Sequence, residues 1–162
     1  MRYFGLVGLL VLVVLSGCLF LDAESPDGGV QDEIGYITSE MGFVFSEGNT
    51  TSVWDKADIC LEPWWDNGVA VPAIQATWWG DSSSIIYDLG ALTIDEAMDM
   101  SPEEGSISCD EWTIWPVDEG HVYTFVDKAS ERVYMRVDSV YVQADEDTYD
   151  ATIWFTYRIS AE

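Results

Sequence analysis

The stretch from Tyr149 to Ile159, YDATIWFTYRI, alternates between two kinds of side chain. The odd-numbered residues, beginning with Tyr149 and Ala151, are apolar or aromatic, and most of the residues between them are polar, with Trp154 as the exception. Because successive side chains of a β-strand point to opposite faces, a period of two indicates a strand with one face turned toward a core. The stretch therefore predicts a half-buried β-strand.

The same alternation recurs along most of the chain. Residues 132–143 alternate on odd positions up to Val137 and on even positions from Val140, and this change of phase predicts a β-bulge near Asp138 and Ser139. Short polar links at 128–131 and 144–148 join the last three strands, which predicts an antiparallel meander. The fold class we expect is mainly β, an antiparallel β-sandwich or open barrel, with further strands at 41–46, 53–61, 69–77, 84–88, 107–115 and 121–127.

One short helix is expected near residues 93–100. Thr93 and Glu96 have the spacing of a capping box, in which each side chain accepts a hydrogen bond from the other residue's backbone N–H. Pro102 and Gly105 follow and should end the helix.

The charge of the chain restricts its partners. It has 30 acidic and 6 basic residues and a formal net charge of −24. Such a surface repels nucleic acid and anionic phospholipid head groups, so we expect no nucleic-acid partner. Aromatic residues make up 14% of the chain, which is enough apolar material for a folded core. A dense acidic shell of this kind also suits an environment of high salt.

The first seventeen residues have the layout of a signal peptide. Arg2 gives a positive start, a nearly unbroken apolar run covers residues 3–14, and small residues follow. The ending Leu15-Ser16-Gly17-Cys18 resembles the lipobox of bacterial and archaeal lipoproteins. This resemblance implies transfer of diacylglycerol to the Cys18 thiol, cleavage before Cys18, and often a further acyl chain such as palmitate. The alternative is an uncleaved membrane helix, although the run is shorter than the about 20 apolar residues that a spanning helix needs.

Three segments follow from this interpretation. Residues 1–17 are the signal peptide, and residues 18–34 are a flexible tether because residues 22–33 are rich in Ser, Pro, Gly and acidic side chains. Residues 35–162 have the size of a single β-rich domain. The domain is expected outside the cytoplasm, anchored by lipid to the cell membrane, or to the outer membrane if the source is Gram-negative.

Two cysteines, Cys60 and Cys109, remain after Cys18. Two thiols in an exported domain most often pair, so we predict a Cys60–Cys109 disulfide. Closing a loop of about 50 residues would stabilise the fold by roughly 4 kcal/mol in the chain-entropy model. A metal site at these thiols, the alternative, would need more Cys or His ligands nearby than the chain offers.

The eight tryptophans are the most unusual feature of the composition. Trp64-Trp65 precede the turn signature Asp66-Asn67-Gly68, and Trp78-Trp79 form a second pair. In an extended segment at least one member of each pair should point away from the core. Exposed aromatic rings beside carboxylates and amides hold sugars and also serve as hot spots of protein interfaces. We therefore predict a binding surface for a protein or glycan at Trp64, Trp65, Trp78 and Trp79; burial of all four in a two-layer core is the alternative.

The segment 145–150 carries a weaker signal for a metal. Asp145, Asp147 and Asp150 could converge on calcium in a tight turn, because calcium takes several oxygen ligands from loops. The segment lacks the glycine and terminal glutamate of an EF-hand loop. A solvated turn without a metal is the alternative, and we expect no cofactor.

Asn49-Thr50-Thr51 is a sequon for N-glycosylation. It matters only in a host that has the modifying enzymes.

Two short blocks raise the question of catalysis. Gly80-Asp81-Ser82 and Asp118-Glu119-Gly120-His121 resemble the Gly-Asp-Ser and Asp-x-x-His blocks of the SGNH/GDSL esterases, a resemblance that implies Ser82 as nucleophile and His121 as base. Ser83 stands where that family has leucine, and no βαβ pattern predicts the parallel sheet of such enzymes. His121, the only histidine, could also be a metal or haem ligand, but it lacks a second histidine.

The leading hypothesis is therefore a non-enzymatic, lipid-anchored surface module that binds a protein or glycan through its tryptophans. A structural envelope lipoprotein without a ligand is the second hypothesis, and a small esterase built on Ser82 and His121 is the third.

Overall fold

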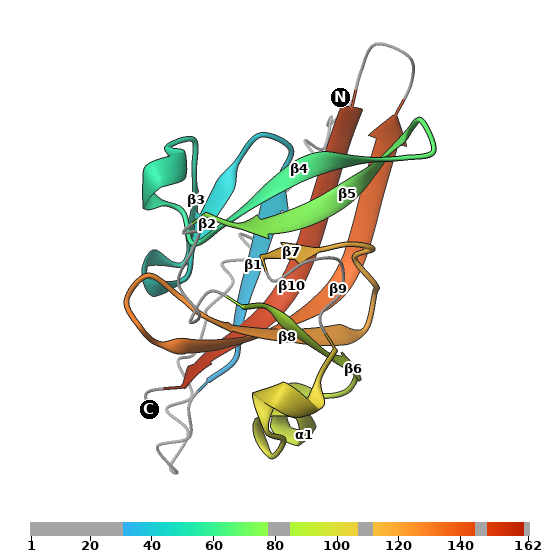
Figure 1. The fold of residues 1–162 in the computed structure, drawn as a ribbon. Helices are drawn as coiled ribbons and strands as arrows, with labels where there is room; N and C mark the ends of the chain where they lie inside the picture. The colour runs from blue at the N-terminus through green and yellow to red at the C-terminus, as the bar shows by residue number, and fades with distance from the viewer. Residues whose placement is uncertain (1–30, 78–84, 107–111, 145–148, 161–162) are drawn as a thin grey trace, which may run out of the picture.

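The computed structural model describes residues 31–77, 85–106, 112–144 and 149–160 (Figure 1). The expected C-terminal meander is one half of the fold. β8 (His121–Val126), β9 (Arg132–Ala144) and β10 (Tyr149–Ser160) pair antiparallel in sequence order. β1 (Glu33–Thr38) adds to β10 and β6 (Tyr87–Ala91) adds to β8, which gives a sheet in the order β1-β10-β9-β8-β6. We call it sheet I.

The predicted β-bulge is confirmed within sheet I. Trp154 of β10 pairs with Ser139 of β9, but the next residue, Phe155, pairs with Val137. Asp138 is therefore the extra residue of β9 and shifts the alternation by one position. Because of this shift, Val133, Met135 and Val137 face the core on one side of the bulge, while Val140 packs against it on the other.

A second antiparallel sheet, sheet II, lies across the first. Its order is β3 (Asn49–Thr51), β2 (Gly42–Val44), β4 (Ile59–Asp66), β5 (Val69–Ala76) and β7 (Thr113–Ile114). β4 and β5 form a hairpin whose turn is Asn67-Gly68, both with positive φ, 51° and 85°. This is the backbone of a tight hairpin turn, as the signature at 66–68 predicted. The hairpin end projects from the body of the molecule (Figure 1).

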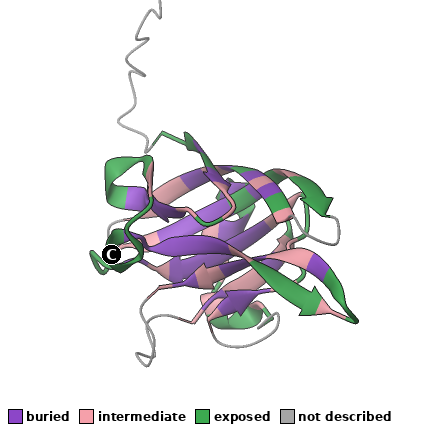
Figure 2. Cartoon of the chain, turned by 90° about the horizontal axis from the view of Figure 1, so that it is seen from above, coloured by how far each residue is buried: buried purple, intermediate pink, exposed green. Residues whose placement is uncertain are grey.

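The hydrophobic core fills the space between the two sheets. Figure 2 shows the buried residues gathered in the middle of the layers and the exposed ones at the hairpin ends and outer surfaces. At its centre Phe43 of β2 meets Phe155 and Tyr157 of β10 edge to face, with ring centroids 5.0 and 5.7 Å apart. The sheets are separate in their pairing and do not close into a barrel, so the expected fold class is found in its sandwich form.

The short helix is also where the sequence places it. α1 (Ile94–Met98) begins with the predicted capping box: the Glu96 N–H donates to Thr93 Oγ1, and the Thr93 N–H donates to Glu96 Oε2. Its buried residues, Ile94 and Ala97, pack against sheet I in a small second cluster with Leu89, Val122 and Tyr134. A 3-10 turn, Pro102–Glu104, follows the helix.

Several predicted element bounds are wrong. The strand expected at 53–61 begins only at Ile59, because Trp54–Lys56 form a 3-10 turn. The strand expected at 41–46 stops at Val44, where the 3-10 turn Phe45–Glu47 begins. The strand expected at 84–88 is β6, which starts at Tyr87, and 107–111 lie outside the described residues.

The strand β1 has no counterpart among the predicted strands. It starts at Glu33, two positions before the expected start of the domain at residue 35, and Glu33 pairs with Tyr157. Within the part of the chain that the structure describes, no helix has the length and hydropathy needed to cross a membrane.

Candidate functional site

The outer face of sheet II, turned away from the core, carries a row of side chains fixed by strand register. Ile59 and Leu61 of β4 point into the core, so Cys60, Glu62 and Trp64 point outward. Their partners on β5 are Gln75, Ala73 and Val71, and β7 adds Thr113 beside Gln75. The register therefore brings one tryptophan, one carboxyl group and one amide to a common surface.

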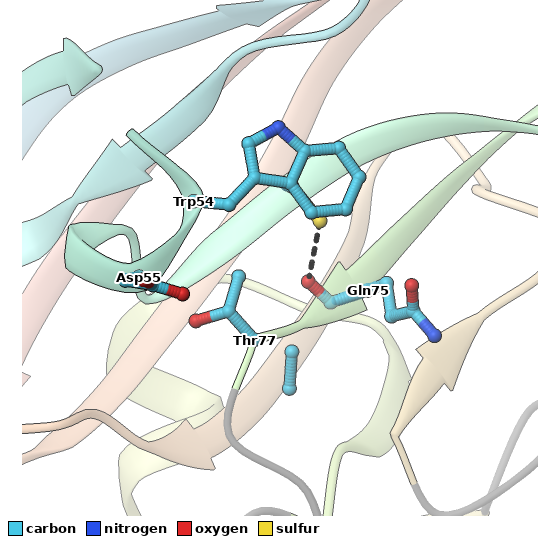
Figure 3. Close-up of a pocket in the computed structure, with 6 residues that line it drawn as sticks. Trp54, Asp55, Gln75 and Thr77 are labelled. Carbon is cyan, nitrogen blue, oxygen red and sulfur yellow. Dashed lines mark hydrogen bonds between the residues drawn. The ribbon is translucent and has the colours of Figure 1, made fainter. Parts of the chain in front are cut away.

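Trp54 encloses one end of this surface. It lies in the 3-10 turn Trp54–Lys56, and its indole forms one wall of a pocket that Gln75 and Thr77 line from β5 and its end (Figure 3). The pocket has a volume of about 150 Å³ and is also lined by Asp55, Cys60 and Ala76. Trp54 is 40% exposed, so its ring covers the pocket and is still accessible from solvent.

A pair of tryptophans lies at the other end. The indoles of Trp64 and Trp115 have centroids 5.9 Å apart and an interplanar angle of 35°. Trp64 also lines a small recess with Glu62, Pro63, Ala73, Gln75 and Thr113. Gln75 lines both hollows, so they are neighbours on one continuous surface. Trp64 lies four positions along the strand from Cys60, which is under Trp54, so the two ends are roughly 13 Å apart.

We call this surface the outer strip and define it by Trp54, Cys60, Glu62, Trp64, Gln75, Thr77, Thr113 and Trp115. Its polar groups are partly shielded from water. Desolvation raises the pKa of the Glu62 carboxyl group above its usual value. Burial also raises the pKa of the Cys60 thiol to about 12, with a smaller contribution from Glu62. As a free thiol, Cys60 donates a weak hydrogen bond to the Gln75 carbonyl oxygen at 3.6 Å.

The outer strip carries groups that can stack on a ligand and form hydrogen bonds with it. It offers aromatic rings at both ends and, between them, an amide, a hydroxyl group and a carboxyl group. Of these, the Thr77 hydroxyl group donates to the Ala57 carbonyl oxygen, which fixes its direction. In comparisons with known proteins, nothing matches. No protein family, no curated protein and no solved structure resembles the chain closely enough to carry an argument.

Of the predicted tryptophan surface, the structure describes the first pair. Trp64 is 38% exposed and Trp65, at the end of the β4–β5 hairpin, is 67% exposed. Register places Trp64 on the outer face of sheet II and Trp65 on the opposite face, where the projecting hairpin end leaves it exposed. Trp78 and Trp79 lie outside the described residues.

The remaining predicted site residues fall into two groups. Asn49 is exposed at the start of β3, where its amide donates to Glu47 at 3.4 Å, and Asp150 is exposed on β10. Cys60 is 1% exposed, and its pairing with Cys109 stays a prediction because Cys109 lies outside the described residues. Cys18, Ser82, Asp145 and Asp147 also lie outside the described residues, so their predicted roles stay predictions.

His121 is the one member of the esterase pair that the structure describes. It is the first residue of β8, and its Nδ1 lies 3.1 Å from both carboxylate oxygens of Asp88. The sequence carries no signal that marks Asp88, on β6, as a site residue.

Sequence reasoning also missed Trp54, Gln75 and Trp115 as parts of the binding surface. The alternation predicts a strand at Trp54 that does not form there, and Gln75 lies among apolar residues of β5. One signal in the sequence could have identified Gln75: it is a polar residue between two apolar residues, Ile74 and Ala76, so in a strand it would point away from the core. The meeting of Trp64 with Trp115 depends on β5 lying between β4 and β7, which local patterns do not reveal.

Proposed function

We propose that this protein is a lipid-anchored, extracytoplasmic module without enzymatic activity that binds a glycan along the outer strip. The observation that carries the proposal is that Trp54 and Trp64, two indoles on the same face of sheet II, flank the polar side chains of Gln75 and Glu62. Sugar rings stack their apolar faces on indoles while amides and carboxylates hold their hydroxyl groups. An extended strip about 13 Å long suits several linked rings better than one compact molecule.

The charge of the protein narrows the class of glycan. With a net charge of −24, the chain repels anionic polysaccharides at a distance, and Glu62 would repel an acidic sugar at the strip itself. The proposed ligand is therefore a neutral or amino-bearing glycan. A protein segment is the other ligand class that exposed tryptophans serve, and it is an outcome that the experiment below separates.

The location is proposed from the sequence of the N-terminus. The lipobox ending in Cys18 supports lipidation, and two or three acyl chains hold a protein stably at a membrane where a single chain does not. A flexible tether from Cys18 to Asp32 would keep the domain on average about 20 Å from its anchor, by the scaling of flexible linkers. The outer strip would then be displayed to ligands outside the cell.

Binding is tested on a glycan array with the soluble domain, in parallel with a pull-down of partner proteins. Trp64→Ala and Trp54→Ala are expected to abolish or strongly weaken glycan binding. The matched control is Trp154→Ala, because Trp154 is 41% exposed but lies on β10 of sheet I. Binding that survives both substitutions in the outer strip, or that falls equally in the control, would contradict the proposal. Binding to a protein alone, lost in the same two variants, would replace the glycan with a protein partner.

Lipidation is tested in the source cell or a bacterial host with a clickable fatty acid. The wild-type chain should incorporate the label and lose residues 1–17, and Cys18→Ser should incorporate none. Cys60→Ser serves as the control because it changes a different cysteine. Mass spectrometry of a mature chain that starts at any residue other than Cys18 would contradict the anchor.

A further inference from the structure

Three side chains with metal-binding atoms converge away from the outer strip. They are Asp88 on β6, Asp118 in the turn before β8, and His121 at the first position of β8. One ligand atom from each lies within 4.8 Å of the others, and the described residues contain no other such group of His, Cys, Asp and Glu. A chain so rich in carboxylates has many acidic neighbours, but only this group adds an imidazole to two of them.

The backbone holds the three groups in place. The Asp88 carboxylate accepts a hydrogen bond from the Gly90 N–H at 2.7 Å. Gly90 has a φ of 91° and directly follows Leu89, the residue at which the register of β6 shifts. The Asp118 N–H donates to the buried hydroxyl group of Tyr123 at 3.0 Å, and the His121 N–H donates to the Asp118 carbonyl oxygen at 3.3 Å. Two of the three ligands thus belong to one tight turn, and the third is fixed opposite them.

Within the described residues, the group holds more acidic than basic side chains. Two carboxyl groups can supply up to two negative charges, whereas one imidazole can supply at most one positive charge. Among the described residues the only ion pair of Asp88 is with His121, and no ion pair joins Asp118 to a basic side chain. A divalent cation would neutralise both carboxylates and would bind the imidazole in its neutral form.

The ligand types select the kind of cation. Calcium and magnesium prefer oxygen ligands alone, whereas imidazole together with carboxylates suits zinc and its neighbours in the first transition row. His121 Nδ1 lies at hydrogen-bond distance, 3.1 Å, from the Asp88 carboxylate oxygens. Tetrahedral zinc ligands with bonds of about 2.0–2.2 Å lie roughly 3.3–3.6 Å apart, so a small movement of the two side chains would admit the ion. Asp118 is exposed, so its side chain can close the remaining distance by a change of rotamer.

We propose that Asp88, Asp118 and His121 form a binding site for one Zn²⁺ ion, with the remaining coordination positions open to water or to a ligand. The side chains of His121 and Asp88 are 29% and 14% exposed, which leaves the ion a path from solvent. This site does not depend on the outer strip, and it uses neither Ser82 nor a cysteine.

The proposal is tested by titrating the soluble domain with Zn²⁺ in a calorimeter, in buffer with excess Mg²⁺ to occupy the general acidic surface. We expect one saturable site per chain, and Co²⁺ in its place should give a visible absorption spectrum typical of nitrogen and oxygen ligands. His121→Ala and Asp118→Asn should each weaken Zn²⁺ binding by roughly 10- to 100-fold or more, the range seen even for residues that only support a ligand.

Asp150→Asn is the matched control. It removes one exposed carboxylate from the segment 145–150 and should leave Zn²⁺ binding unchanged. Because Asp118 is exposed, Asp118→Asn keeps the fold even if a substitution at the half-buried His121 does not. Absence of saturable Zn²⁺ binding, or binding that is unchanged in both site variants, would overturn the proposal. Binding that falls in Asp150→Asn alone would move the metal site to the 145–150 segment.

Discussion

The Oδ2 atom of Asp58 accepts a hydrogen bond from the backbone N–H of Phe45 at 2.8 Å. Its other oxygen, Oδ1, accepts from the backbone N–H of Lys128 at 3.1 Å, and the side chain is 2% exposed. Phe45 follows β2 in sheet II, whereas Lys128 belongs to the turn between β8 and β9 in sheet I. One buried carboxylate therefore joins the two layers of the sandwich.

Asp58→Ala should destabilise the domain severely. The substitution leaves the buried N–H of Phe45 and the partly buried N–H of Lys128 without their partner, and the loss of a buried partner costs about 1–3 kcal/mol. We expect the free energy of unfolding in urea to fall by roughly 2–5 kcal/mol. The control is Asp55→Ala, at an exposed residue three positions earlier, which should change it by no more than about 0.5 kcal/mol. Equal effects of the two substitutions would refute the role given to Asp58.

The same carboxyl group should make stability depend on pH in a defined direction. Desolvation raises the pKa of Asp58 above its ordinary value of 3.8, against the opposing effect of its two backbone hydrogen bonds. At pH values between the pKa of Asp58 in the unfolded chain and its higher pKa in the folded protein, the native state binds more protons than the unfolded state. The free energy of unfolding therefore falls as pH rises through the pKa of the folded protein. The stabilisation that comes from the raised pKa of Asp58 is fully present at pH values below the pKa of this group in the unfolded chain.

The comparison that isolates this effect is with Asp58→Asn, which does not titrate. As pH is lowered from neutral toward 3.8, the unfolding free energy of the wild type should rise relative to that of the variant. A difference that is constant over this range, or that shrinks on acidification, would show that the pKa of Asp58 is not raised.

The local sequence determined the parts of the fold that local rules govern. Alternation located β10 and β9, the change of phase located the bulge at Asp138, and the Thr93–Glu96 spacing located the start of α1. The strand β1 was missed because its pattern is weak: Ile34 is 82% exposed and Gly35 is buried. Only pairing with β10 makes it a strand, and that pairing spans more than a hundred residues of sequence.

Gly35→Ala tests how tightly β1 approaches the core. A Cβ atom at this position would lie 2.5 Å from Cε2 of Phe155 and 2.9 Å from Cζ of Phe43, both in the aromatic centre. Because rings packed on several sides cannot move freely, we expect a loss of about 1–3 kcal/mol, typical of an overpacked core. Thermal unfolding measures it, with Ile34→Ala on the exposed face of the same strand as control. A Gly35→Ala variant as stable as the wild type would show that β1 can shift outward.

The tryptophans of the outer strip should contribute little to folding, which separates them from the core. Trp64→Ala removes a partly exposed side chain from the outer surface of sheet II, so we expect a loss of about 1 kcal/mol or less in urea unfolding. Phe155→Ala, at a fully buried ring, should cost about 3–5 kcal/mol. If Trp64→Ala is as damaging as Phe155→Ala, the indole is a structural residue and its role in binding loses support.

The two candidate sites differ in how far the sequence could predict them. Trp64 was found because an unusual residue type stands beside a turn signature. Asp88 was not, because an aspartate in an acidic chain carries no signal of its own, and its contact with His121 depends on β6 pairing with β8. The partners of a functional residue come from the topology, which is set by burial across the whole sandwich.

The predicted Cys60–Cys109 disulfide can be tested by counting thiols. Burial raises the pKa of Cys60 to about 12, so near neutral pH almost none of a free thiol would be the reactive thiolate, and slow labelling of the native protein would be expected either way. The informative sample is the soluble domain, which lacks Cys18, denatured without a reductant. If the bridge exists, a thiol reagent labels no cysteine in this sample and two after reduction. Two labels without reduction would contradict the disulfide. The Cys60→Ser variant does not distinguish the two cases, because it has one free thiol, that of Cys109, with or without the bridge in the wild type. The wild-type count, taken before and after reduction, is therefore the measurement that decides.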